Sequence, residues 1–219
     1  MSEHQHDHDD APDYFEQAGW DERYSGPDTI WSGNPNPQLV TEVTGLTPGT
    51  ALDLGSGEGG DVIWLAQQGW TVTGADFSPE GLARAARHAE EAGVGERTSW
   101  WRVDARTFAE DHEQAGSPTF DLVTTHFLHP GTSMVEVVAE LTKAVAPGGH
   151  LLVVGHAPSE VFTHHSPKQQ AAMWHAEDML AALGEDFETL VVEQRPRRVE
   201  RDGRVVEIDD ATLLARRIA

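Results

Sequence analysis

The sequence contains no cysteine among its 219 residues. This absence excludes a disulfide framework, a thiolate nucleophile and a zinc site built on cysteine ligands. No apolar run approaches the roughly 20 residues that cross a bilayer. The first residues, "MSEHQHDHDD", also lack the apolar core of a secretory signal. We therefore expect a cytoplasmic protein.

Positive charge is scarce. Lys and Arg number 15 against 37 Asp and Glu, so the formal net charge is −22 with histidine neutral. A nucleic-acid surface needs clustered Lys and Arg to contact phosphates, and anionic membrane surfaces attract the same residues. The composition therefore argues against both kinds of partner, and the simplest meaning of the charge is solubility. The length suits one α/β domain with a substantial core.

The chain begins with a polar tail and an aromatic segment. Residues 1–12 are rich in His and Asp and are expected to be disordered, although such a tail could bind metal weakly. Helices are expected at residues 13–24 and 37–45. They flank an irregular loop at residues 25–35, where Gly, Pro and Asn are frequent.

From residue 50 onward, apolar strands alternate with amphipathic helices. Asp202-Gly203 is a hairpin signal between the last two strands. The pattern predicts a doubly wound, Rossmann-like α/β fold with a seven-stranded, mostly parallel sheet, an antiparallel C-terminal hairpin and helices on both faces. The expected strands are residues 50–56, 71–77, 98–105, 120–127, 150–157, 187–200 and 204–217, and the expected helices are 60–69, 78–93, 134–149 and 168–184.

Ligands of such sheets bind at the carboxyl ends of the strands, near the point where the strand order reverses. The first strand ends in the loop "GSGEGG". Its Gly55, Gly57 and Gly60 have the Gly-x-Gly-x-x-Gly spacing of a dinucleotide loop, so spacing alone leaves NAD open. Asp53 lies inside this strand, where an acid must be paired or hydrogen-bonded. It either orients the glycine loop or accepts from a ligand amine.

The next two strand ends also carry acids. Asp76 lies about 20 residues past the first glycine, where a carboxylate binds ribose hydroxyls. Phe77 beside it is placed to flank an adenine ring. A helix-capping role for Asp76 is less favoured, because Ser78 already fills it. At the third strand end, Asp104 either accepts from an adenine amine, with the backbone of Ala105 near the ring, or is a capping residue.

Three histidines follow the fourth and fifth strands. His126, His129 and His156 are expected to converge above the sheet edge as bases, ligands or hydrogen-bonding groups. Three histidines also suit a metal site. The carboxylate of a helix-borne metal motif is missing from the sequence, so a polar pocket wall without metal is the favoured interpretation.

The set of motifs resembles the class I S-adenosylmethionine-dependent methyltransferases. The motifs are "LDLGSGEGG", "GADFS", "RVDA", "FDLVTTHF" and "APGGHLLVV", in that order between residues 50 and 158. The "PGG" turn and the closing hairpin are typical of that family and not of NAD dehydrogenases. The flanks "WDERYSGPDTIWSGNPNPQLV" and "RDGRVVEIDDATLLARR" are similar to the thiopurine and tellurite-resistance type. Ser56 stands where relatives often have cysteine.

The resemblance implies S-adenosylmethionine as cofactor and S-adenosylhomocysteine as product. The methionine part would contact the glycine loop and His126, and the aromatic residues Trp20, Tyr24 and Trp31 would fold over the cofactor. These aromatics belong to an expected cap at residues 13–49, which covers a core at residues 50–219. Core packing of the N-terminal helix is the alternative for those aromatics. The implied cofactor-binding residues are Trp20, Tyr24, Trp31, Asp53, Gly55, Ser56, Gly57, Asp76, Phe77, Asp104, Ala105 and His126.

The expected function is methyl transfer to a small-molecule acceptor, such as a thiol, a chalcogen compound or another small nucleophile. A thiolate needs no strong base, whereas a phenol or amine might use His126 or His129. Residues 20–37 and 159–174 are expected to form a lid. Alternatives are a non-catalytic sensor of the cofactor, a methyltransferase of protein side chains, and a protein with a histidine-bound metal.

Overall fold

The computed structural model describes residues 15–27, 30–159, 170, 172–201 and 204–218. The expected tail at residues 1–12 and most of the expected lid at 159–174 lie outside these residues. The strands are β1 (Thr50–Leu54), β2 (Thr71–Asp76), β3 (Thr98–Arg102), β4 (Phe120–His126), β5 (Val145–His156), β6 (Phe187–Arg201) and β7 (Arg204–Arg217).

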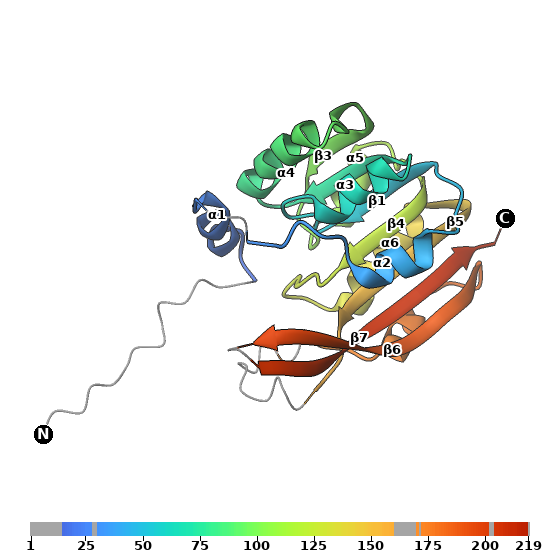
Figure 1. The fold of residues 1–219 in the computed structure, drawn as a ribbon. Coiled ribbons are helices and arrows are strands. Elements are labelled where there is room, and N and C mark those ends of the chain that lie inside the picture. The colour runs from blue at the N-terminus through green and yellow to red at the C-terminus, as the bar shows by residue number, and fades with distance from the viewer. Residues whose placement is uncertain (1–14, 28–29, 160–169, 171, 202–203, 219) are drawn as a thin grey trace, which may run out of the picture.

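The seven strands form one sheet in the order β3-β2-β1-β4-β5-β7-β6 (Figure 1). The first five pair in parallel, whereas β7 is antiparallel to both β5 and β6. This arrangement confirms the predicted fold class. The strand order reverses between β1 and β4, which places the ligand-binding end of the sheet above these two strands.

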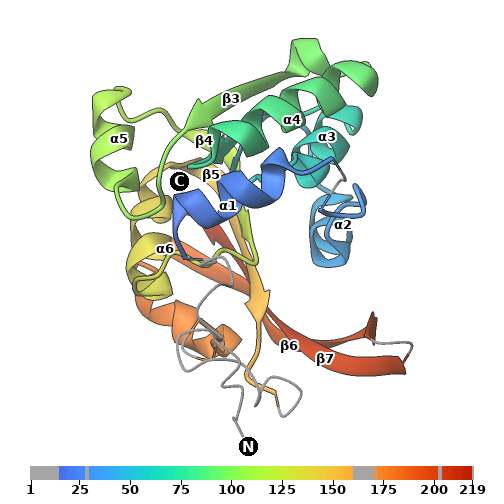
Figure 2. The ribbon, with the colours of Figure 1, turned by 90° about the vertical axis from the view of Figure 1, so that its left-hand side faces the viewer.

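Helices cover both faces of the sheet (Figures 1 and 2). Ser78 caps α4 by accepting a hydrogen bond from the Gly81 N–H, and Pro79 begins that helix, as the sequence predicts. The helices are α1 (Gln17–Ser25), α2 (Pro37–Val43), α3 (Gly60–Gln67), α4 (Pro79–Glu91), α5 (Phe108–Gln114) and α6 (Met134–Lys143), with 3₁₀ helices η2 (Gly95–Arg97) and η4 (Ala176–Ala182).

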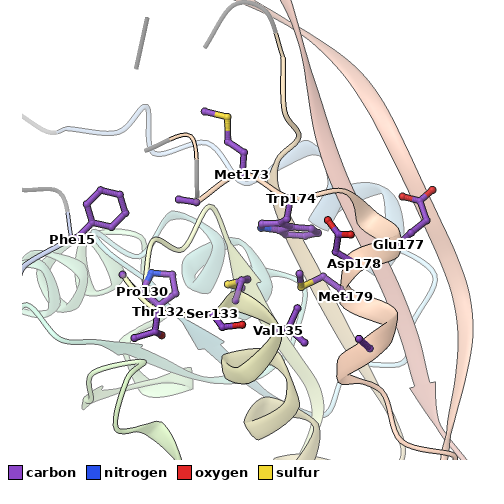
Figure 3. Close-up of a pocket in the computed structure, with 14 residues that line it drawn as sticks. Phe15, Pro130, Thr132, Ser133, Val135, Met173, Trp174, Glu177, Asp178 and Met179 are labelled. Carbon is purple, nitrogen blue, oxygen red and sulfur yellow. The ribbon is translucent and has the colours of Figure 1, made fainter. Parts of the chain in front are cut away.

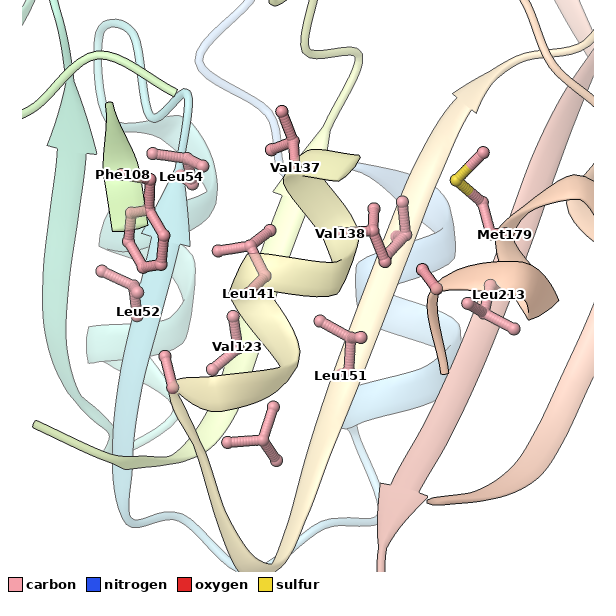
Figure 4. Close-up of a cluster of buried hydrophobic side chains, with 14 of the residues drawn as sticks. Leu52, Leu54, Phe108, Val123, Val137, Val138, Leu141, Leu151, Met179 and Leu213 are labelled. Carbon is pink, nitrogen blue, oxygen red and sulfur yellow. The ribbon is translucent and has the colours of Figure 1, made fainter. Parts of the chain in front are cut away.

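Alternate residues of the central strands point to opposite faces and form two apolar cores. Leu52 and Leu54 of β1 face α5, α6 and η4, whereas Ala51 faces α2 and α3. Figure 4 shows the first core, in which Leu141 of α6 lies over the sheet. Each large apolar side chain buried in this way contributes about 1.5–3 kcal/mol. The two cores hold the loops at the carboxyl ends of the strands on a rigid base.

Two predicted helices differ from the structure, and one helix was not predicted. The helix predicted from residue 134 to a stop at Pro147 and the glycines ends earlier, at Lys143, because Val145 already pairs with Phe120 of β4 and starts β5. The helix predicted at 168–184 is not continuous: Gln170 is helical, residues 173–175 are not, and residues 176–182 form the 3₁₀ helix η4. Helix α5 was not predicted at all.

Trp174 explains why residues 173–175, just before η4, are not helical. Its backbone N–H donates to the carbonyl of His156, and its ring lies against Gly155, where a side chain would come within 2.6 Å of it. The chain is therefore held against the end of β5 just before η4 begins. Among the described residues, no helix has the length and apolar character needed to cross a bilayer.

Candidate functional site

A cavity of about 1150 Å³ opens at the carboxyl ends of the strands, above β1 and β4. Its position is the one that the fold class predicts. Asp53 lies beneath its floor and is not a lining residue. The other predicted site residues all line the cavity: Trp20, Tyr24, Trp31, Gly55, Ser56, Gly57, Asp76, Phe77, Asp104, Ala105, His126, His129 and His156.

The glycine loop forms the floor of the cavity between β1 and α3. Gly55, Gly57 and Gly59 have φ values of 82°, 51° and 86°, in the left-handed region that favours glycine. A side chain on Gly57 would come within 2.8 Å of the Tyr24 hydroxyl. At Gly55 and Gly57 the loop thus presents backbone to the cavity, whereas Ser56 and Glu58 line it as well.

Asp76 joins the end of β2 to the glycine loop. One carboxylate oxygen accepts from the Gly57 N–H at 2.9 Å, and the other accepts from the Ser78 N–H at 2.9 Å. Burial raises the pKa of Asp76 to about 6, and these two hydrogen bonds oppose that rise. Each oxygen can accept a further hydrogen bond, so two donors of a ligand could still be bound.

A buried charge cluster lies beside the loop. His126 Nδ1 is 3.1 Å from a carboxylate oxygen of Asp61 and 3.3 Å from one of Asp53. Burial disfavours the charged imidazole, but the charges of Asp61 and Asp53 outweigh it and raise the pKa of His126 to about 10. His126 is therefore an imidazolium at neutral pH. Its Nε2 is buried and has no hydrogen-bond partner.

The two acids of this cluster differ in their surroundings. Burial raises the pKa of Asp53, which also accepts from the Thr124 hydroxyl at 2.7 Å. Burial alone would raise the pKa of Asp61 as well, but His126 and the Asn36 N–H, at 2.6 Å, hold it below its usual range. No helix-borne metal motif with a carboxylate is visible in the sequence, but the structure brings two carboxylates, Asp53 and Asp61, to His126 from distant parts of the chain.

These three residues could also hold a cation. Their ligating atoms lie within 4.8 Å of one another. Among the described residues, this is the group of three His, Cys, Asp or Glu side chains close enough to hold a metal ion. The set differs from the three histidines considered from the sequence, of which His129 and His156 are not members. In this cluster the His126 imidazolium already provides the positive charge that the two carboxylates need.

The predicted aromatic residues lie together over the glycine loop. The rings of Trp20 and Tyr24 stack with centroids 5.6 Å apart, and Trp20 lies 6.0 Å from Trp31. The Trp31 indole N–H donates to the Tyr24 hydroxyl at 3.4 Å. Burial raises the pKa of Tyr24, and the negative charge of Asp76 raises it further. The cluster therefore presents aromatic faces and a neutral hydroxyl to the cavity.

Glu58 fixes this aromatic segment to the glycine loop. One oxygen of its carboxylate accepts from the backbone N–H groups of Ile30 and Trp31, at 3.0 and 3.1 Å. The other forms an ion pair with Arg84 of α4 at 2.8 Å, and Arg84 also donates to the carbonyl of Gly26. Both charged side chains are buried. The sequence analysis did not identify Glu58.

Asp104 is already engaged within the protein. Its carboxylate accepts from the Arg106 backbone N–H at 2.9 Å and pairs with the Arg106 guanidinium at 2.7 Å, which holds the pKa of Asp104 below its usual range although burial opposes this. The structure thus gives Asp104 a local structural role beside a place on the cavity wall. Phe77 and Ala105 line the cavity next to it.

The opposite end of the cavity is formed by β4, β5 and the β6–β7 hairpin. Phe127 has a φ of 51°, a strained value for a residue other than glycine, and its ring stacks on His156 at 4.4 Å. His129 lies 6.4 Å from His156 between ring centroids. Burial lowers the pKa of His129, and a hydrogen bond with the Phe127 backbone only partly opposes this. His129 is therefore neutral at pH 7.

Sequence reasoning missed several lining residues at this end and beside the loop. Asp61 was visible as an acid in the first turn of the helix after the glycine loop. Arg197 and Ile208 were visible only as members of the hairpin, and no local motif distinguishes them. They face each other across β6 and β7 and reach the cavity because the hairpin extends past the end of β5 (Figure 2).

A second hollow of about 640 Å³ lies beside the main cavity, with Pro130 on both walls. Figure 3 shows Met173, Trp174 and Met179 on one side and Phe15 on the other. Its walls are mainly apolar, with the carboxylates of Glu177 and Asp178 at one side. Asp178 is engaged there, because it accepts from the His175 backbone N–H.

Comparison with known proteins identifies the class. The family described as "Methyltransferase domain" matches residues 51–149. The phosphatidylethanolamine N-methyltransferase of Cereibacter sphaeroides is 30% identical over 155 residues, which cover 68% of this chain and 73% of that protein. Hemagglutinin 1 of Eikenella corrodens is 26% identical over 175 residues, which cover 78% of this chain and 56% of that protein. This chain spans about half the length of several other curated relatives.

A solved structure shows the same fold. The N-methyltransferase NodS from Bradyrhizobium japonicum WM9, in complex with S-adenosylhomocysteine, has a TM-score of 0.65 at 18% identity, covering 92% of this chain and 97% of that chain. With these matches, the chain belongs to the class I S-adenosylmethionine-dependent methyltransferases, enzymes that use S-adenosylmethionine as methyl donor.

The residues of the cavity fit this cofactor. The floor at Gly57 has no room for a side chain. Asp76 has acceptor capacity for two hydroxyls, and the buried His126 Nε2 offers an unpaired donor beside the loop. A ligand with a diol and a carboxylate matches these groups. The roles of individual residues stay predictions.

Proposed function

We propose that this protein transfers a methyl group from S-adenosylmethionine to a small-molecule nucleophile. The observation that carries the proposal is the Asp76–Gly57 hydrogen bond, which sets a buried carboxylate and a bare glycine loop side by side where the strand order reverses. The cavity above them, of about 1150 Å³, has room for the cofactor and a small acceptor together.

The chain's own residues would hold the cofactor at three points. Asp76 would accept from the ribose hydroxyls. The His126 imidazolium, held by its two carboxylates, would donate through Nε2 to the carboxylate of the methionine part. Tyr24 and Trp31 would place aromatic faces and a neutral hydroxyl near the positive sulfur.

When bound, S-adenosylmethionine supplies an activated methyl group on a sulfonium, and the electron pair of the breaking carbon–sulfur bond stays on sulfur. The acceptor's nucleophilic atom forms the new bond to the methyl carbon. The protein contributes alignment and exclusion of water. The aromatic segment held by Glu58 lies over the cavity and would serve both purposes.

Of the two predicted bases, His129 is the better candidate. Its pKa is lowered, so a neutral imidazole is present at pH 7 to take a proton from a phenol, an amine or a thiol. His126 is already protonated at that pH, and its proton is held between two carboxylates. An acceptor that arrives as an anion would need neither histidine.

The test measures binding and transfer separately. Calorimetry with S-adenosylhomocysteine should show uptake by the wild type and none by Asp76→Ala. A panel of small thiols, phenols and amines is then incubated with S-adenosylmethionine, and S-adenosylhomocysteine formation is measured. Asp186→Ala is the matched control, because Asp186 is exposed and pairs with Arg217 far from the cavity.

Uptake of the cofactor with turnover of at least one acceptor is the expected result. Uptake without any turnover would favour a cofactor sensor. Formation of S-adenosylhomocysteine with a protein extract as acceptor, but with no small molecule, would favour a methyltransferase of protein side chains. No uptake of either cofactor form would contradict the proposal as a whole.

A further inference from the structure

The acids and the arginine that line the cavity come from different elements. Five acids line it, namely Glu58, Asp61, Asp76, Glu91 and Asp104; four of them lie in the glycine loop, in the first turn of α3 or at the ends of β2 and β3, and Glu91 ends α4. Among the described lining residues, Arg197 of the hairpin is the sole Lys or Arg. Asp210 balances the charge of Arg197, so what the hairpin end of the cavity offers a ligand is the N–H groups of the guanidinium that Asp210 does not bind.

Arg197 is held in a fixed orientation. Its Nε and Nη2 bind the two carboxylate oxygens of Asp210 at 2.9 and 3.2 Å, and Asp210 is fully buried. The guanidinium also lies over the Phe127 ring at 5.2 Å. A guanidinium has five N–H donors, and the bonds to Asp210 use two of them. The remaining N–H groups lie on a side chain that lines the cavity, where a ligand could accept from them.

The surroundings of Arg197 are suited to an apolar molecule that carries one charge. The Phe127 ring stacks on His156, and Ile208 faces Arg197 across the hairpin. Near these residues, His129 is half-buried and lies edge-on to Phe15, with ring centroids 6.1 Å apart. A fixed guanidinium beside flat apolar side chains is a favourable site for a carboxylate on a ring or short chain.

We infer that the hairpin end of the cavity is the methyl-acceptor site, and that it takes a small anionic molecule whose oxyanion group binds Arg197. The inference rests on the proposed function. With its oxyanion on Arg197, the acceptor would direct its nucleophilic atom toward the glycine loop.

The chain offers a matched control at the next residue. Arg198 points to the other face of β6, its side chain is 79% exposed, and it pairs with Glu207 at 3.6 Å. Arg198→Gln removes the same charge from the same strand without reaching the cavity. Arg197→Gln leaves the buried Asp210 without its partner and could impair folding, so Arg197→Lys, which keeps the charge, is studied with it.

The experiment measures binding to the protein saturated with S-adenosylhomocysteine, at constant ionic strength. The probes are benzoate and benzamide, which have nearly the same shape and differ in charge. We expect benzoate to bind the wild type about tenfold more tightly than benzamide. Arg197→Gln should abolish that preference, Arg197→Lys should retain part of it, and Arg198→Gln should leave it unchanged.

Three results would overturn the inference. These are equal binding of the two probes by the wild type, absence of benzoate binding at millimolar concentration, and equal losses in the Arg197→Gln and Arg198→Gln proteins. The wild-type comparison decides the matter even if Arg197→Gln does not fold. Failure to bind S-adenosylhomocysteine would instead contradict the proposed function, so the two failures are distinguishable.

Discussion

Asp76 is the residue on which we expect the binding of the cofactor to depend most. It is buried, it accepts two backbone hydrogen bonds, and its pKa is raised to about 6. Burial and nearby acids disfavour its charge, and the hydrogen bonds favour it. Ribose hydroxyls would add two donors that favour the charged form further. Binding of the cofactor and ionisation of Asp76 should therefore be linked.

We predict that affinity for S-adenosylhomocysteine falls as the pH is lowered through about 6, approaching a tenfold loss for each further pH unit. Protonation of Asp76 removes the acceptor that the hydroxyls need. Calorimetry between about pH 5 and pH 8 measures this. Asp76→Asn should bind weakly and show no such dependence. Asp104→Asn should keep it, because the pKa of Asp104 is lowered. A wild-type affinity that does not change over this range would contradict the prediction.

His126 gives a second prediction, on stability. Its folded-state pKa of about 10 is above the ordinary value of 6.5, so its contribution is complete below about pH 6.5 and is lost as the pH rises toward 10. His126→Gln leaves Asp53 and Asp61 buried without a cation, and we expect it to lower the free energy of unfolding by about 3–5 kcal/mol at pH 7.

Chemical denaturation at several pH values tests this. The difference between wild type and His126→Gln should shrink as the pH approaches 10. His112→Gln is the control, because His112 is buried but contacts the carbonyl of Pro118 in place of a carboxylate. A difference that is constant from pH 7 to 10 would show that His126 does not act through its charge.

At the scale of residues, the sequence predicted those cavity residues that belong to local motifs. Gly57 and Asp76 were found because a glycine loop and a strand-end acid have fixed places in this fold. The pairing of His126 with Asp53 and Asp61 was not found, since it depends on how β1, β4 and α3 meet in space. Arg197 was not found either, because alternation along a strand does not reveal which residue faces a cavity.

At the scale of elements, the aromatic segment depends on Glu58. We predict that Glu58→Gln lowers stability by about 3 kcal/mol, because the buried Arg84 loses its charged partner. The backbone N–H groups of Ile30 and Trp31 should exchange with solvent faster, since they lose their anionic acceptor. Affinity for S-adenosylhomocysteine should fall as well, because the aromatic residues are no longer held over the loop.

Denaturation, hydrogen exchange and calorimetry measure these three effects. Glu16→Gln is the control, because Glu16 forms an exposed pair with Arg106 at 3.4 Å, and removing such a pair changes stability by less than about 1 kcal/mol. If Glu58→Gln binds S-adenosylhomocysteine as tightly as the wild type does, the aromatic segment does not need Glu58 to contribute to binding.

The elements themselves were predicted where their signals are local. Strands and capped helices such as α4 came from alternation, Ser78 and Pro79. Helix α5 has weaker signals, an acidic first turn and apolar Phe108, and is too short for a clear periodicity. The non-helical backbone at residues 173–175 is a tertiary effect, because Trp174 is held against Gly155 on β5.

At the scale of the whole molecule, the net charge of −22 and the acids around the glycine loop act together. S-adenosylmethionine carries one net positive charge at neutral pH, and S-adenosylhomocysteine carries none. The two differ by one methyl group and that charge. An acidic protein should therefore attract the substrate form over long range and release the product form more readily.

We predict that the affinity for S-adenosylmethionine falls by a few-fold when salt is raised from about 50 mM to about 500 mM, because salt screens exposed charges. The affinity for S-adenosylhomocysteine should change much less over the same range. Calorimetry with both ligands measures the difference, and neutral sucrose at matched osmolality controls for solvent effects. Equal salt dependence of the two ligands would mean that the contacts within the cavity alone, and not the acidic field of the molecule, distinguish substrate from product.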